Sequence, residues 1–307
     1  MRSMRSHAAP STRLIRPLCL TSLVTVACLL VSCGDSSTTS ETVVPATVLT
    51  STDASTTVVA ETGDLSAGFQ LATWGSNVTV TYEDGMLHYV SDGLPNHERD
   101  AQYAVPTGGV VVPDASTATA TDDPTVAQSY DYLIPLTPTK AATTTPTSLG
   151  VIGVMISGAS LFNPYEGDGS TVATQSNFSV KDANGNDVWF LDDCAGHPTP
   201  MGQYHYHALP KCVTATVDQT DGASHIIGIA FDGYPIYGDR DINGNHLTAA
   251  DLDECNGITG PTPEFPGGVY HYVLLDVADS TSSIRCFSGV VDESLTSMAG
   301  MPGMGAP

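Results

Sequence analysis

Gly202-Gln203-Tyr204-His205-Tyr206-His207-Ala208-Leu209 and Gly268-Val269-Tyr270-His271-Tyr272-Val273-Leu274-Leu275 are two copies of one sequence pattern, G-x-Y-H-Y-x-x-L. Histidine alternates with tyrosine in both copies, and a period of two residues is typical of a β-strand. Side chains at i and i+2 share one face of a strand, about 6–7 Å apart. His205 and His207 can therefore point into one site, with the tyrosines on the opposite face. Neighbouring imidazoles are typical ligands of a transition metal.

A second repeated segment indicates an internal duplication. Val151-Ile152-Gly153-Val154-Met155-Ile156-Ser157-Gly158 is similar to Ile226-Ile227-Gly228-Ile229-Ala230-Phe231-Asp232-Gly233, and each segment precedes its own copy of the tyrosine-histidine pattern. The chain is also rich in glycine, proline and β-branched residues. We therefore predict a mainly β fold: a disulfide-stapled β-sandwich or barrel-like domain with an internal duplication. Its two β modules, at about residues 150–212 and 225–286, are expected to pack face to face.

Local patterns predict two further elements. Val78-Thr79-Val80-Thr81-Tyr82 and Met86-Leu87-His88-Tyr89-Val90 flank Glu83-Asp84-Gly85, which predicts a β-hairpin with a glycine-bearing turn. Helical periodicity is scarce, and residues 247–254 are the one segment expected to form a short helix.

The N-terminal residues have the features of an export signal. An apolar run from Leu18 to Val31 follows a basic segment and ends in Leu30-Val31-Ser32-Cys33, which resembles a bacterial lipobox. We predict a lipoprotein signal peptide at residues 1–32 and lipidation of Cys33, which would attach the protein to a membrane of the bacterial cell envelope, facing the periplasm or the cell surface. An ordinary secretory signal with a chance cysteine is the alternative.

Composition divides the remaining chain. Residues 33–64 are rich in Thr and Ser and are expected to form a flexible tether, whereas residues 293–307 form a Met/Gly/Pro tail that we expect to be disordered. The folded domain is expected to span residues 65–292. Without the signal segment, six Lys and Arg remain against thirty-three Asp and Glu, a formal charge of −27. Such a surface repels phosphate backbones, so nucleic acid is excluded as a partner.

Four cysteines remain in the predicted domain: Cys194, Cys212, Cys255 and Cys286. An even number in an exported chain indicates disulfides, and three connectivities are open. Sequence order favours Cys194–Cys212 and Cys255–Cys286. A four-thiolate zinc site is the competing interpretation, but no C-x-x-C spacing supports it.

Several segments resemble motifs of the bacterial YHYH-motif domain family. They are Gly93-Leu94-Pro95-Asn96-His97, Cys194-Ala195-Gly196-His197-Pro198, the Tyr204-His205-Tyr206-His207 run followed by Pro210 and Cys212, Phe231-Asp232-Gly233-Tyr234-Pro235-Ile236-Tyr237-Gly238, and Leu252-Asp253-Glu254-Cys255-Asn256-Gly257. The resemblance covers most of residues 65–290 and assigns no activity. The chain departs from the family at Val273, where relatives commonly have a second histidine.

Histidines and one carboxylate are the candidate metal ligands. His205 and His207 share a strand face, and His271 has the place of His205 in the second copy. His197 and His97 lie in proline-bearing turns, and Asp232 follows an apolar strand. The proposed set, expected to bind copper or zinc, is His205, His207, His271, His197, His97 and Asp232. The alternative is that tyrosines and histidines only hydrogen-bond across strands in a polar core, and that Asp232 caps its turn.

An acidic segment resembles a calcium-binding loop, with ligands expected at Asp239, Asp241, Asn243, Asn245 and Asp251. The twelfth position of that loop is Ala250 instead of a bidentate glutamate. A solvated acidic turn is therefore the alternative to a calcium site.

Motifs of common enzyme classes are missing from the sequence: it has no G-x-S-x-G, Walker A or H-E-x-x-H. Whether the protein is an enzyme stays open, and any catalysis would be metal-dependent. We expect a cell-envelope lipoprotein with a histidine-rich site that binds copper or zinc. The alternative is a metal-free surface module that recognises a glycan or a protein partner.

Overall fold

The computed structural model describes residues 63–296, which all belong to one compact unit of the chain. The predicted signal peptide, Cys33, nearly all of the predicted tether and the end of the predicted tail lie outside these residues. No helix among residues 63–296 combines the length and apolar character needed to span a bilayer.

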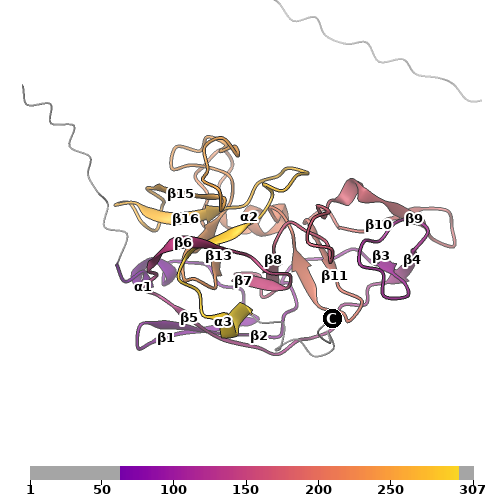
Figure 1. Ribbon diagram of the computed structural model, residues 1–307, viewed down its shortest axis with the longest axis horizontal. Helices are drawn as coiled ribbons and strands as arrows, with labels where there is room; N and C mark the ends of the chain where they lie inside the picture. Colours follow the sequence, from indigo (N-terminus) through magenta and orange to yellow (C-terminus); the bar gives the residue numbers. More distant parts are fainter. Residues whose placement is uncertain (1–62, 297–307) are drawn as a thin grey trace, which may run out of the picture. The chain divides into compact units, whose positions relative to one another are not determined.

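An eight-stranded sheet joins both copies of the tyrosine-histidine pattern (Figure 1). In spatial order its strands are β11 (Gly196–Pro198), β12 (Tyr204–Tyr206), β8 (Ser160–Phe162), β7 (Val151–Met155), β13 (Ile226–Ala230), β14 (Pro235–Tyr237), β16 (Val269–Val273) and β15 (Gly257–Gly260). We call β7, β8, β11 and β12 the first module, and β13, β14, β15 and β16 the second module.

Strand pairing is the same in the two modules. β7–β8 and β13–β14 are antiparallel, β8–β12 and β14–β16 are parallel, and β12–β11 and β16–β15 are antiparallel again. The repeated segments supply the innermost strands, β7 and β13, which pair antiparallel with each other at the centre. The expected face-to-face packing of the modules is therefore wrong: they lie side by side in one sheet. β7 and β13 are buried along their whole length, and each satisfies its backbone hydrogen bonds with the strands on its two sides, β8 and β13 for β7, and β7 and β14 for β13.

Smaller sheets and short helices surround this sheet. They are β1 (Val78–Glu83), β2 (Met86–Ser91) and β5 (Tyr130–Pro135) in one sheet; the pairs β3 (Gln102–Pro106) with β4 (Ala118–Asp122), β9 (Ser179–Lys181) with β10 (Asp187–Trp189), and β6 (Lys140–Pro146) with β17 (Cys286–Gly289); the helices α1 (Ser66–Phe69), α2 (Lys211–Val217) and α3 (Glu293–Thr296); and the 3-10 turn η1 (Gln175–Asn177).

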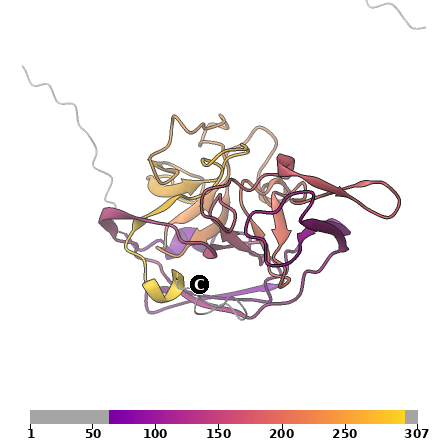
Figure 2. The same ribbon diagram turned by 45° about the vertical axis from the view of Figure 1, so that its right-hand side comes forward.

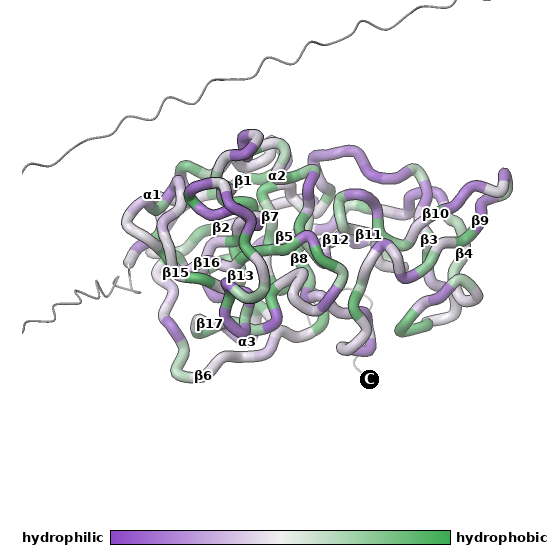
Figure 3. The backbone as a smooth tube through the Cα atoms, turned by 90° about the horizontal axis from the view of Figure 1, so that it is seen from above, coloured by the Kyte–Doolittle hydropathy of each residue, from purple (hydrophilic) through white to green (hydrophobic). Residues whose placement is uncertain are grey.

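The β1-β2-β5 sheet packs on the central sheet and makes the fold two-layered there (Figure 2). The Tyr89 hydroxyl of β2 donates to the Met155 carbonyl at 3.0 Å, and the Tyr132 ring of β5 lies 5.0 Å from that of Phe231. Figure 3 shows the hydrophobic character of β7 and β13. The prediction of a mainly β fold is confirmed, and the strands of residues 63–296 close no barrel.

The predicted hairpin is confirmed, whereas the predicted helix is wrong. β1 and β2 pair from Val78↔Ser91 to Glu83↔Met86, and the two turn residues Asp84 and Gly85 have φ of 52° and 75°. Residues 247–254 form turns, because the Asp251 carboxylate accepts the Thr248 N–H and hydroxyl. Helix α2 was not expected.

A buried carboxylate fixes the start of β11. Oδ1 of Asp192 accepts the N–H groups of Cys194 and Gly196 at 2.9 and 3.1 Å, and Oδ2 accepts the Tyr204 hydroxyl at 2.7 Å. Ala195 adopts a φ of 58° inside this turn. The phenol of β12 is thereby tied to the turn that precedes β11.

The second module repeats this turn. Oδ1 of Asp253 accepts the N–H groups of Cys255 and Gly257 at 2.9 and 2.8 Å, and Oδ2 accepts the Tyr270 hydroxyl at 2.9 Å. Asn256 takes the left-handed position, with a φ of 68°. The predicted duplication therefore extends to individual hydrogen bonds.

Gly257→Ala should destabilise the protein by about 1–3 kcal/mol, because the added Cβ would overlap the Tyr270 phenol. Gly260→Ala is the matched control on the same strand, since a Cβ there meets nothing within 4 Å. Urea unfolding of both variants measures the difference, and equal unfolding free energies would contradict the close packing at Gly257.

Candidate metal centre

Three imidazoles of the first module converge at one end of the central sheet. His197 of β11 lies opposite His205 of β12 in the strand register, and His207 follows on the same face of that segment. Nε2 of His207 lies 2.9 Å from Nε2 of His205 and 3.3 Å from Nε2 of His197. His197 is only 7% exposed, and His205 and His207 are each 2% exposed, so the cluster is closed from solvent.

Backbone carbonyls fix which nitrogens carry protons in two of the rings. Nδ1–H of His205 donates to the Gln203 carbonyl at 3.1 Å, and Nδ1–H of His207 donates to the Asn163 carbonyl at 2.7 Å. A carbonyl only accepts, so Nδ1 is protonated in both neutral rings and each Nε2 carries a lone pair. Two lone pairs then face each other across 2.9 Å. That arrangement is repulsive unless a cation lies between them.

Burial keeps the cluster neutral. It lowers the pKa of His207 to about 4 and holds the pKa of His197 and of His205 well below the usual value. The neighbouring imidazoles lower the pKa of His197 and His205 further. At neutral pH the rings are therefore in the unprotonated form that binds metals.

Aromatic rings wall the cluster. Phe162 of β8 stacks on His205 with ring centroids 3.8 Å apart and planes at 26°, and Phe190 lies 4.2 Å from the His197 ring. These walls and the Asn163 and Gln203 carbonyls were not predicted. Their one sequence signal is position: Phe162 ends the strand that follows the repeated apolar segment, and Asn163 comes directly after it.

His271 lies outside the cluster. It occupies the place of His205 in β16, and its Nδ1–H donates to the Val269 carbonyl at 3.0 Å, as that of His205 does to Gln203. Ile258 faces His271 in the register as His197 faces His205, and Val273 has the position of His207. Four strands separate β16 from β12, so the pseudo-symmetry holds the equivalent histidines apart.

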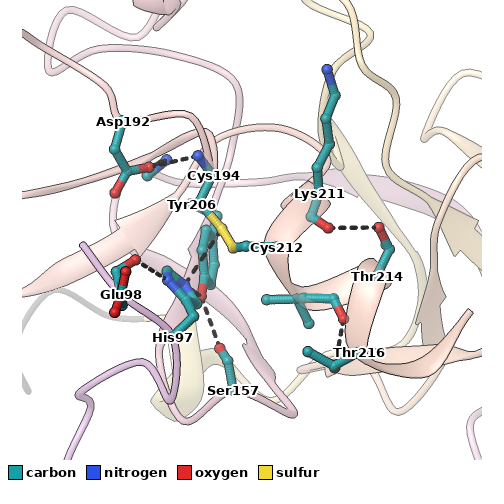
Figure 4. Close-up of a disulfide and its surroundings, with 12 residues drawn as sticks. His97, Glu98, Ser157, Asp192, Cys194, Tyr206, Lys211, Cys212, Thr214 and Thr216 are labelled. Atoms are coloured by element: carbon teal, nitrogen blue, oxygen red, sulfur yellow. Dashed lines mark hydrogen bonds between the residues drawn. A yellow bond between two sulfur atoms is a disulfide. The ribbon is translucent and has the colours of Figure 1, made fainter. Parts of the chain in front are cut away.

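His97 lies on the tyrosine face of β12, against a disulfide (Figure 4). Its Nδ1–H donates to the Glu98 carbonyl at 2.7 Å, so Nε2 accepts the Tyr206 hydroxyl at 2.6 Å; Nε2 is also 3.5 Å from Sγ of Cys194. His97 is therefore separated from His205 and His207 by the strand itself. Cys194 is bonded to Cys212, and Cys255 to Cys286, which confirms the predicted pairing.

Asp232 belongs to a different buried network. Its Oδ2 accepts the Tyr272 hydroxyl at 2.5 Å and the Gly289 N–H at 2.9 Å, which ties β16 to β17. Burial raises the pKa of Asp232 to about 6. Tyr206 has the equivalent place in the first module, where the Ser157 hydroxyl takes the place of the Asp232 carboxylate and His97 is a second partner.

Local hydrogen bonds occupy the carboxylates of the predicted calcium loop. Oδ1 of Asp241 accepts the N–H groups of Asn243 and Asn245, both at 2.8 Å, and Asp239 pairs with His246. Asp251 accepts Thr248. Asp182 makes the same turn with Asn184 and Asn186. A repeated turn that satisfies its own carboxylate accounts for this sequence pattern without an ion.

The remaining histidines of residues 63–296 pair with carboxylates. His88 contacts Asp131 and His225 contacts Glu264, each at 2.7 Å. With His246, they lie outside the cluster.

A sequence model of the YHYH protein family matches residues 131–248 and 241–289, a stretch that contains all three clustered histidines. No curated protein and no solved structure matches the chain.

Acid should destabilise the metal-free protein, because the buried imidazoles of the cluster resist protonation in the folded state. Below pH about 6.5 the unfolded chain takes up protons, whereas folded His207 stays neutral until its pKa of about 4. Stability is therefore lost as pH falls from about 6.5 to 4, by about 3 kcal/mol for His207 alone. Urea unfolding across this range should show a shallower loss in His207→Gln than in the wild type; equal slopes would contradict a neutral, buried His207.

Proposed function

Since the chain belongs to the YHYH protein family, we propose a function from the imidazoles that its matched region gathers: His197, His205 and His207 bind one transition-metal ion, copper or zinc. The observation that carries this proposal is the pair of facing Nε2 lone pairs, 2.9 Å apart. A cation between them turns a repulsive contact into two bonds.

The spacing of the nitrogens also supports the binding of a metal ion. Metal–nitrogen bonds of about 2.0–2.1 Å place two ligand nitrogens about 3.3–3.6 Å apart at tetrahedral or trigonal angles. The two Nε2 separations are 2.9 and 3.3 Å, so a small opening of the cluster admits an ion. The carbonyls of Gln203 and Asn163 already orient two of the rings, as outer-shell groups do in metal sites.

The second module argues against a purely structural role for the cluster. It forms the same strands and the same carboxylate-capped turn with Ile258 and Val273 in place of two of the histidines. Packing alone is thus satisfied by apolar side chains at these positions. Burying three imidazoles in the first module instead costs stability unless they bind something.

The alternative function, recognition of a glycan or a protein partner, would use tyrosine rings as a stacking surface. Tyr204, Tyr206, Tyr270 and Tyr272 are all buried, so these rings offer no stacking surface. We propose the metal site as the function, in a lipoprotein attached to the bacterial cell envelope through Cys33. The support for that location is the lipobox-like sequence.

Purified protein should take up one copper or zinc ion per chain. His205→Ala and His207→Ala should each weaken binding by more than about 100-fold, since even outer-shell partners of metal ligands contribute about 10- to 100-fold. His271→Ala is the matched control: it removes the equivalent imidazole of the second module and should leave binding unchanged. Metal analysis and competition with a chelator measure these affinities. Uptake that survives both cluster substitutions would refute the site.

Loss of the first disulfide should weaken metal binding. Cys194 and Cys212, 18 residues apart, enclose all three ligands, and their closure is worth about 3 kcal/mol of stability for a loop of this length. Cys194→Ser with Cys212→Ser should therefore lower metal affinity at least about tenfold. The control is Cys255→Ser with Cys286→Ser, which opens the second module. If both double variants bind metal equally well, the disulfide does not organise the site.

A further inference from the structure

The three ligands bring no negative charge to the ion. The cluster consists of His197, His205 and His207, with no carboxylate or thiolate among its members. An ion bound here therefore keeps its whole charge.

The surroundings make that charge costly. The Phe162 and Phe190 rings pack against His205 and His197, and the ligands are almost fully buried. The cost of moving an ion from water into such a medium rises with the square of its charge, so a divalent ion meets about four times the cost of a monovalent one.

The number of ligands also favours a monovalent ion over a divalent one. The cluster offers one nitrogen from each of three rings. Zinc takes four ligands in structural sites and three protein ligands with a water in catalytic sites, and this cluster is closed from the solvent that would supply that water. Cu(II) favours tetragonal geometry. Cu(I) has a filled d shell and is satisfied by two or three nitrogen ligands.

We propose that the ion bound by His197, His205 and His207 is Cu(I). The site excludes divalent ions because it supplies no anionic ligand. This inference rests on the proposed function of the cluster and adds the identity and charge of the ion. The site is thus one for holding cuprous copper in an oxidising compartment.

Metal-free protein, with its disulfides intact, is titrated anaerobically with Cu(I) in ascorbate against a chromophoric Cu(I) chelator. Cu(II) and Zn(II) are titrated separately. We expect the site to favour Cu(I) over Cu(II) at least about 100-fold. The reduction potential of the bound copper would then lie about 120 mV or more above that of the aqueous ion. The copper-loaded protein should stay silent in electron paramagnetic resonance after exposure to air.

His197→Glu tests the charge argument directly, because it keeps a donor atom and adds one negative charge. The preference for Cu(I) over Cu(II) should fall at least about tenfold in this variant, and His271→Glu, in the second module, should leave it unchanged. An unchanged preference in His197→Glu, or wild-type protein that holds Cu(II) or Zn(II) as tightly as Cu(I), overturns the Cu(I) proposal alone. Uptake of none of the three ions overturns the proposed function as well.

Discussion

The Asp192 carboxylate is the group on which the geometry of the first module depends. It accepts two backbone N–H groups at the entry to β11 and the hydroxyls of Tyr204 and Tyr103, the latter at 2.8 Å. These bonds set the pairing of β11 with β12, and that register places His197 opposite His205. Since one buried carboxylate satisfies donors from separate segments, its loss would leave several unpaired polar groups in the core.

The duplicated architecture separates what the fold requires from what the candidate site requires. Both modules retain the capped turn, the tyrosines that flank the first histidine of the pattern, and a disulfide. Only the first module retains three imidazoles. The scaffold is therefore complete without the three imidazoles, and the cluster is an addition to it.

Period-two patterns allowed the strands, the hairpin and the shared face of His205 and His207 to be predicted, because strand geometry is local. His197 could be included because it stands beside Pro198, a few residues before the first tyrosine-histidine strand. The grouping of His271 with them was an argument from pseudo-symmetry, and the structure separates these residues because the modules join through β7 and β13 at the centre of one sheet. A single sequence does not show whether repeats meet at their faces or at their edges. Helix α2 was missed for a related reason, since the β-branched residues of Lys211–Val217 favour a strand locally and tertiary packing overrides that preference.

The position of the first disulfide has an evolutionary consequence. Every imidazole of the cluster belongs to one continuous stretch of chain between the two half-cystines, and the second module closes a corresponding ring around Ile258, His271 and Val273. Recombination that copied one ring onto the other would add or erase all three imidazoles in a single event. Descendants of such a duplicated gene could differ in how many imidazole clusters they carry while keeping the same framework.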